Sequence, residues 1–119
     1  MSPRRTVNAA ATSPLQGLPA FARRVLDVVD AIPAGRVMSY GDIAAWLDDS
    51  GPRAVARVMA LYGSEVPWHR VLRSDGTCAP EVAMRQVPLL RAEGVPFGRS
   101  YDRVRMADAR WDPRHQLLS

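Results

Sequence analysis

The stretch GRVMSYGDIAAWLDDSGPRAVARVMALYG, residues 35–63, predicts two short helices joined by a tight turn. Ser39 and Asp42 have the spacing of a capping box, so a helix of roughly nine residues should start there and end at the Asp-Asp-Ser-Gly turn. Pro52 suits the first position of a second helix, and Gly63 suits its end. Two helices in this arrangement are typical of a helix-turn-helix.

Both helices carry apolar residues at helical spacing, which marks the face that packs inward. The first helix ends before Gly51. Its inward residues are Ile43, Ala44 and Leu47, with Trp46 near the edge. The inward residues of the second helix are Val55, Val58, Met59 and Tyr62.

The flanking segments complete the predicted fold. Residues 18–33 show an apolar helical stripe between two prolines, and residues 36–38 form a short extended piece. Residues 68–79 have the pattern of two short strands around a Ser-Asp-Gly turn, a β-hairpin. Residues 81–94 are helical in pattern, and Pro88 either kinks this helix or starts a separate one. We therefore expect a mainly α protein with a small β-hairpin, a winged helix-turn-helix DNA-binding domain.

Length and composition indicate one domain. The chain has 119 residues, of which 47% are hydrophobic. Residues 1–17 lack a sustained period and are expected to form a flexible basic arm, whereas residues 18–119 form the domain. Within it, residues 95–119 show no clean periodicity, and residues 100–119 receive no assignment. Cys78 is the one cysteine, which excludes an internal disulfide and a cysteine-based metal site.

These features also predict where and how the protein works. A single cysteine suits a reducing compartment, no apolar signal segment follows the first arginines, and no apolar run reaches the length of a membrane span. We expect a cytoplasmic monomer, nucleoid-associated if the protein is bacterial. No cofactor, metal or membrane is expected to take part.

The charge indicates a polyanionic partner. The net charge is +4, and all 16 basic residues are arginine. A GC-rich genome alone would explain the absence of lysine, whereas the forked donors of arginine suit phosphates and bases. Residues 25–50 carry one arginine and five acids, but residues 51–119 carry eleven arginines and seven acids. The positive surplus therefore returns in the second half of the chain, which favours nucleic acid as the partner.

Three segments together resemble a known family. IPAGRVMSYGDIA (residues 32–44), ARVMA (56–60) and PWHRV (67–71) are similar to the C-terminal domain of the O6-alkylguanine-DNA alkyltransferases. The resemblance covers roughly residues 18–97 and places Trp68 where the family has its nucleophilic cysteine. That replacement is typical of the alkyltransferase-like proteins, which bind alkylated guanine without repairing it. The resemblance implies a non-enzymatic sensor of O6-alkylguanine in duplex DNA that marks the lesion for nucleotide excision repair proteins.

The resemblance also assigns DNA-binding roles. Tyr40 would lie at the target nucleotide and help to rotate its phosphate. Arg57 would enter the base stack from the minor groove and fill the place of the flipped base, with Arg53 beside it. Ala54 and Ala60 would keep the helix slim enough to approach the groove floor. The ordinary alternatives are an aromatic side chain in the core for Tyr40 and a solvated surface arginine for Arg57.

The expected lesion pocket contains Trp68, Val71, Tyr40 and His69. Trp68 offers a flat apolar wall and one N–H donor, although a core tryptophan on a strand is the plain alternative. His69 and Glu93 match a pair that activates the cysteine in the transferases. Without that cysteine, we expect them to form a structural hydrogen bond.

Some assignments stay open. Arg73 and Arg85 are both candidates for a basic residue that contacts the lesion. Cys78 is expected to be a half-buried hairpin residue. Two rival functions remain: a winged-helix transcription regulator that reads the major groove, and an enzyme that uses Cys78 or His69.

Overall fold

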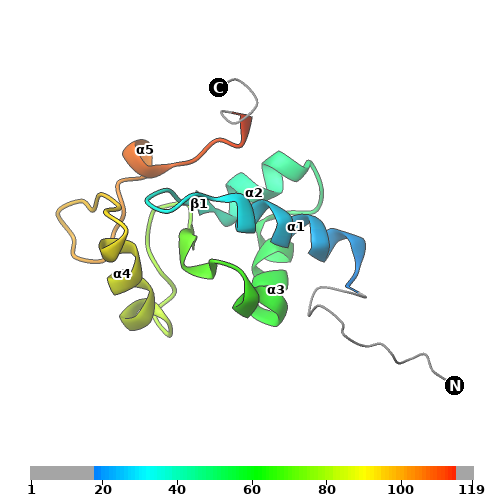
Figure 1. The fold of residues 1–119 in the computed structure, drawn as a ribbon, viewed down its shortest axis with the longest axis horizontal. Coiled ribbons are helices and arrows are strands. Elements are labelled where there is room, and N and C mark those ends of the chain that lie inside the picture. The colour runs from blue at the N-terminus through cyan, green and yellow to red at the C-terminus, as the bar shows by residue number, and fades with distance from the viewer. Residues whose placement is uncertain (1–17, 115–119) are drawn as a thin grey trace, which may run out of the picture.

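The structure, a computed structural model, describes residues 18–114; the predicted arm at 1–17 and the end of the tail at 115–119 lie outside the described residues. The helices are α1 (Ala20–Ala31), α2 (Tyr40–Leu47), α3 (Pro52–Tyr62), α4 (Ala83–Ala92) and α5 (Met106–Ala109). Two 3-10 turns, η1 (Gly63–Glu65) and η2 (Trp68–Arg70), and two strands, β1 (Met38–Ser39) and β2 (Val71–Leu72), complete the order. In Figure 1, α1, α2 and α3 lie together and α4 stands apart from them. No described helix combines the length and the apolar character needed to cross a membrane.

The predicted helix-turn-helix is present as α2 and α3. Ser39 Oγ accepts a hydrogen bond from Asp42 N at 2.9 Å, and Asp42 Oδ2 accepts one from Ser39 N at 3.0 Å, so the capping box is complete. In the turn, Asp48 and Ser50 adopt left-handed backbone conformations with φ of 52° and 54°. Pro52 occupies the start of α3. These local signals explain why this part of the fold follows from the sequence.

The predicted hairpin, in contrast, is wrong. β1 and β2 run parallel, with Met38 beside Val71. A tight turn cannot join parallel strands, and here α2 and α3 form the connection between them. The Ser-Asp-Gly turn itself is present, as the hydrogen bond from Arg73 N to Thr77 O at 3.1 Å shows. Thr77 then makes an antiparallel bridge to Arg103 instead of extending the pair of strands.

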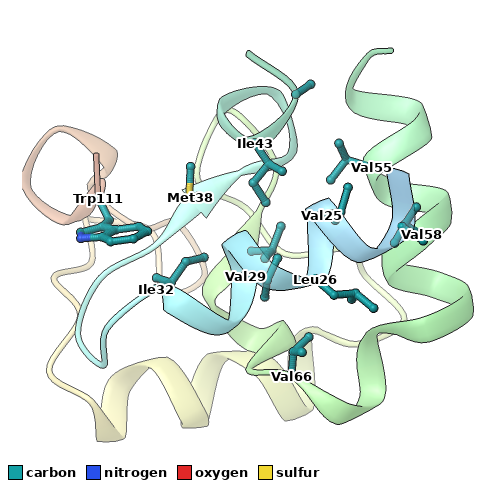
Figure 2. Close-up of a cluster of buried hydrophobic side chains, with 13 residues drawn as sticks. Val25, Leu26, Val29, Ile32, Met38, Ile43, Val55, Val58, Val66 and Trp111 are labelled. Atoms are coloured by element: carbon teal, nitrogen blue, oxygen red, sulfur yellow. The ribbon is translucent and has the colours of Figure 1, made fainter. Parts of the chain in front are cut away.

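Two clusters of buried side chains hold these elements together. The first packs α1 against α2 and α3, and Figure 2 shows its side chains meeting between these helices. Its labelled members are Val25, Leu26, Val29, Ile32, Met38, Ile43, Val55, Val58, Val66 and Trp111. The second cluster involves α4 and consists of Val37, Leu72, Cys78, Val87, Leu90, Val95, Val104 and Ala109.

The chain after residue 100, which shows no periodicity, joins both clusters. Val37 N donates to Ala109 O at 3.0 Å, and Trp111 N donates to Val37 O at 2.8 Å. Trp111 is buried in the first cluster and Ala109 in the second. A segment without a sequence pattern therefore ties Val37, the residue directly before β1, to the end of the described chain.

Pro88 lies inside α4 and does not divide it, so one helix runs from Ala83 to Ala92. Proline removes one backbone donor and usually disrupts a helix interior. In α4, the buried side chains of Val87 and Leu90 on either side of it pack into the second cluster. The tertiary packing of α4 thus outweighs the tendency of Pro88 to disrupt a helix.

Candidate nucleic-acid interface

A central cavity of about 560 Å³ lies between α3 and α4. Tyr40, from the start of α2, and Trp68, from η2, supply its aromatic side chains. Small residues of α3 and η1 line one side: Ala56, Ala60, Gly63 and Ser64. The remaining lining residues are Met59, Val71, Arg73, Ala79, Glu81, Val82, Arg85 and Gln86. The cavity thus combines two aromatic rings, apolar contacts and charged groups, as expected of a site for a flat polar ligand.

Trp68 forms a wall of this cavity and is only partly buried. It begins the 3-10 turn η2, so the alternative of a core tryptophan on a strand is wrong. The Arg85 guanidinium lies 5.4 Å from the centre of the Trp68 ring, within the range of a cation–π contact. This contact places a positive charge next to the aromatic wall.

Gln86 fixes the segment that carries Trp68 and was not anticipated from the sequence. Its side chain is 3% exposed, and its Nε2 donates to His69 O at 3.0 Å and to Val71 O at 2.9 Å. Burying an amide costs free energy unless it is hydrogen-bonded, so these two bonds lock η2 against α4. The signal in the sequence is a polar residue on the inward face of the α4 pattern, directly before Val87.

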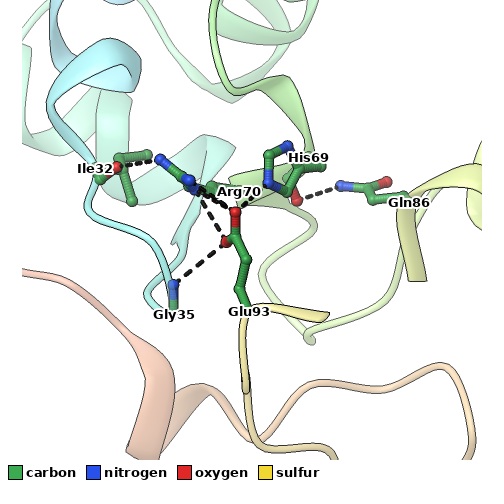
Figure 3. A network of polar contacts seen from close by, with 6 residues as sticks. All are labelled: Ile32, Gly35, His69, Arg70, Gln86 and Glu93. Atoms are coloured by element: carbon green, nitrogen blue, oxygen red, sulfur yellow. Dashed lines mark hydrogen bonds and ion pairs between the residues drawn. The ribbon is translucent and has the colours of Figure 1, made fainter. Parts of the chain in front are cut away.

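Glu93 holds a second polar network, shown in Figure 3. His69 Nε2 lies 2.8 Å from Glu93 Oε2, so the expected hydrogen bond between these residues is present. Arg70 contacts both carboxylate oxygens, with Nη2 2.7 Å from Oε2 and Nε 3.0 Å from Oε1. Arg70 Nη1 also donates to Ile32 O at 2.8 Å, and Gly35 N donates to Glu93 Oε1 at 3.3 Å. The network therefore joins η2 to the ends of α1 and α4.

The same network determines the ionisation of Glu93 and the place of His69. Hydrogen bonds from Arg70, then from His69 and Gly35, lower the pKa of Glu93 from 4.5 to about 2, against the opposing effect of burial. The carboxylate is therefore ionised at neutral pH. His69 is directed to Glu93 and is not among the residues that line the central cavity, unlike Tyr40, Trp68 and Val71, with which it was expected to lie.

Tyr40 lines the cavity from the first position of α2. Burial raises the pKa of Tyr40 above its usual 10.0, an effect that Arg73 opposes and that Cys78 and Glu81 reinforce. The phenol therefore keeps its proton at neutral pH and can donate a hydrogen bond into the cavity.

Apart from Tyr40, the predicted DNA-binding residues lie along α3. Arg53, Arg57 and Ala54 line a second hollow of about 580 Å³, whereas Ala60 lines the central cavity. The other lining residues of the second hollow are Pro19, Phe21, Ala22, Val58, Leu61 and Tyr62. The Arg57 side chain is exposed and makes no hydrogen bond or ion pair within residues 18–114. α3 thus stands between two hollows, with the Arg57 side chain available to a partner.

The structure also gives the positions of Arg73 and Arg85, the two candidates for a basic residue that contacts the lesion. Arg73 and Arg85 both line the central cavity, and so does Glu81, a carboxylate to which the sequence assigned no role.

Cys78 is buried in the second cluster, more deeply than expected, and does not line the cavity. Burial raises the pKa of the Cys78 thiol to about 11, so it is protonated at neutral pH and a poor nucleophile. Residues 18–114 contain no group of three or more His, Cys, Asp or Glu side chains that could hold a metal ion.

The chain is similar to several known proteins. Residues 20–95 match the family described as "6-O-methylguanine DNA methyltransferase, DNA binding domain". A "DNA base-flipping protein" of Escherichia coli is 37% identical over 100 residues, covering 77% of this chain and 74% of that protein. "Alkyltransferase-like protein 1" of Schizosaccharomyces pombe is 39% identical over 82 residues, covering 63% of this chain and 76% of that protein.

A solved structure is similar as well. The crystal structure of S. pombe Atl1 in complex with damaged DNA containing O6-carboxymethylguanine has a TM-score of 0.70 at 33% identity. The similarity covers 78% of this chain and 95% of that one. The fold expected from the sequence, mainly helical with a helix-turn-helix, is therefore confirmed.

Proposed function

Because this chain belongs to the family of the 6-O-methylguanine DNA methyltransferase DNA-binding domain, we propose that it binds damaged DNA containing O6-alkylguanine. The observation that carries the proposal is the central cavity, in which Trp68 and Tyr40 face a space of about 560 Å³ beside α3. Relatives named for base flipping and for alkyltransferase likeness support it, as does the solved complex of such a relative with an alkylated base.

In a base-flipping mechanism, Arg57 and the hollows on either side of α3 would act together. The O6 atom of guanine lies on the major-groove edge, so a helix in the minor groove reaches it only if the base leaves the stack. Extrusion costs on the order of a few kcal/mol, and less at a damaged pair. In this proposal, α3 enters the minor groove, Arg57 fills the vacated place in the stack, and the base enters the central cavity beside α3.

Contacts within the cavity would hold the extruded base. The ring of Trp68 offers a surface for the base or its alkyl group, and Val71 adds apolar contact. The protonated Tyr40 phenol can donate a hydrogen bond to the phosphate or base. Arg73 and Arg85 add positive charge near the DNA backbone, so salt should weaken binding through counterion release.

We further propose that the protein senses the lesion without repairing it. Trp68 has no thiol to accept an alkyl group, and Cys78 is buried outside the cavity with its proton retained. A bound complex with an extruded base would then mark the site for nucleotide excision repair proteins. The rival function, a transcription regulator, is less well supported, because α3 offers alanines beside Arg53 and Arg57 where base-edge donors would be needed.

The decisive experiment compares one duplex with and without a central O6-methylguanine. We expect tighter binding of the alkylated duplex, and both affinities should fall as salt rises. The comparison is repeated with several alkyl groups by fluorescence anisotropy. Equal affinity for alkylated and unmodified duplexes would contradict the sensor function and favour a general DNA-binding role.

A further inference from the structure

Among the described residues that line the central cavity, Glu81 carries the one carboxylate. It lies directly before α4, in the turn closed by the hydrogen bond from Val82 N to Ala79 O at 3.1 Å, and it is exposed. Burial is the main reason why the pKa of Tyr40 is raised, and the charge of Glu81 adds to this rise. The carboxylate therefore acts on a second lining residue and belongs to the site proposed for the extruded base.

Glu81 has no partner within the described part of the chain. Arg73 and Arg85 line the same cavity, yet Glu81 makes no hydrogen bond or ion pair within residues 18–114. The Arg85 guanidinium lies instead 5.4 Å from the centre of the Trp68 ring. An ionised carboxylate accepts hydrogen bonds and cannot donate them, and it repels phosphates. A hydrogen-bond donor on the bound DNA would offset this repulsion.

Gln86 contributes a second acceptor to the same cavity. Its Nε2 donates to His69 O, as Figure 3 shows, and to Val71 O. Its Oε1 accepts no hydrogen bond within residues 18–114, although Gln86 is only 3% exposed. A buried acceptor without a donor costs free energy, which a donor on a ligand in the cavity would recover.

The chemistry of the lesion identifies the donor. Unmodified guanine has an N1–H and a 2-amino group, whereas alkylation at O6 leaves the ring without a hydrogen on N1. The O6, N3 and N7 atoms are not donors, and the phosphates of the DNA backbone accept hydrogen bonds as well. Enzymes that extrude a base read it through hydrogen bonds to its edge. The 2-amino group is therefore the donor that a carboxylate in this cavity can bind.

We propose that Glu81 accepts a hydrogen bond from the 2-amino group of the extruded base and thereby restricts the central cavity to bases that carry this group. The proposal rests on the proposed function, because the base reaches the cavity by extrusion. Gln86 Oε1 is available to the second hydrogen of the same amino group. Glu81 is thus a specificity-determining residue, while Trp68 and Val71 contact the ring or the alkyl group.

Two lesions that differ in the 2-amino group alone test this role. One duplex contains O6-methylguanine, and its twin contains O6-methylhypoxanthine, which has a hydrogen in place of the amino group. Fluorescence anisotropy gives both dissociation constants for the full-length wild type, Glu81→Gln and Glu81→Ala, and the ratio of the two constants is compared. The amino group also affects pairing with the opposite cytosine. Its effect on the cost of extrusion is the same for every protein and cancels between ratios.

The preference for O6-methylguanine over its twin should fall about tenfold in Glu81→Ala, because a hydrogen bond to a charged acceptor is lost. Glu81→Gln should retain part of the preference, since its amide oxygen still accepts. Glu65→Ala is the matched control, because Glu65 is exposed on η1 and does not line the cavity. It should change both affinities alike and leave their ratio within about twofold. Both glutamates are exposed, so all three variants should fold.

Two results would overturn the role of Glu81. These are a wild-type ratio in Glu81→Ala, and an equal fall of the ratio in Glu65→Ala, which would show that charge and not contact sets the preference. A third duplex with unmodified guanine checks the proposed function separately. A wild type that binds O6-methylguanine no more tightly than guanine would contradict the lesion sensor and the role of Glu81 with it. Lesion preference with an unchanged ratio in Glu81→Ala would contradict the role of Glu81 alone.

Discussion

Arg70 and Glu93 form a two-point contact, with Arg70 Nη2 2.7 Å from Glu93 Oε2 and Arg70 Nε 3.0 Å from Glu93 Oε1. Both side chains are 17% exposed. Paired nitrogen donors fix a carboxylate in orientation as well as in charge. Because Glu93 also accepts from His69 and from Gly35 N, this contact sets the position of the segment that carries Trp68.

Removal of the guanidinium should therefore destabilise the fold. We expect Arg70→Ala to lower the free energy of unfolding by about 2 kcal/mol, because it leaves a partly buried carboxylate without its main partner. Urea denaturation measures the change. Arg73→Ala is the matched control, since the Arg73 side chain is exposed and makes no hydrogen bond or ion pair within residues 18–114, and the substitution should change stability by less than about 0.5 kcal/mol. Equal losses in the two variants would contradict a structural role for the pair.

The low pKa of Glu93 predicts a loss of stability in acid. Its folded pKa of about 2 lies below its ordinary 4.5, so the stabilisation is complete above the unfolded value and is lost as the pH falls through the folded one. The shift corresponds to about 3 kcal/mol. Urea midpoints measured between about pH 6 and pH 3 should fall in the wild type and fall less in Glu93→Gln. Parallel curves for the two proteins would show that other groups control the acid response.

The parts of the fold that could be predicted are those with local causes. Ser39, Asp42 and Pro52 set the starts of α2 and α3 through contacts within a few residues, so the sequence pattern was sufficient. The partner of β2 could not be predicted, because a parallel pair forms between distant segments and the Ser-Asp-Gly turn wrongly favoured a hairpin.

The candidate site likewise contains some residues that could be predicted from the sequence and others that could not. Tyr40, Trp68 and Val71 lie together in the cavity, as their family motifs indicated. Arg70 and Gln86 were not anticipated, because several of their acceptors are backbone carbonyls, whose positions depend on the tertiary fold and not on the residue type.

Arg57 should be required for flipping and not for folding. Arg57→Ala removes the exposed side chain proposed to fill the base stack, so the fluorescence of a 2-aminopurine beside the lesion should lose its increase on binding. Lesion affinity should fall about tenfold or more. Arg23→Ala, an exposed arginine on α1, serves as the control for charge alone. An undiminished flipping signal in Arg57→Ala would rule out this role.

Substitutions of Tyr40 can separate the contribution of its ring to lesion binding from that of its hydroxyl group. Tyr40→Ala should weaken lesion binding through loss of both the ring and the hydroxyl, by about 1–3 kcal/mol. Tyr40→Phe should retain part of the affinity if the ring itself displaces the nucleotide. Anisotropy titrations with the alkylated duplex measure both. Wild-type affinity in Tyr40→Ala would mean that the residue serves only to pack the start of α2.

Trp68→Cys should fail to restore alkyl transfer. The variant regains the PCHRV motif with His69 and Glu93 in place, but loss of the indole opens a large space beside Arg85. The alkyl carbon should then lie too far from the sulfur, or out of line, and small misplacements reduce rates strongly. Binding should weaken too, because the aromatic wall is lost. The measurement is transfer of a labelled methyl group from DNA to protein; stoichiometric transfer within minutes would show that only the nucleophile had been missing.

The backbone hydrogen bonds that join Val37 to Ala109 and Trp111 also affect folding during synthesis. A chain leaves the ribosome from its N-terminus, and α2 and α3 can form from contacts close in sequence as soon as they emerge. The bonds of Val37, directly before β1, can form only after residues 109 and 111 have emerged. We therefore expect a nascent chain released before residue 109 to expose Val37 and part of both clusters, which would make it a substrate for chaperones and proteases.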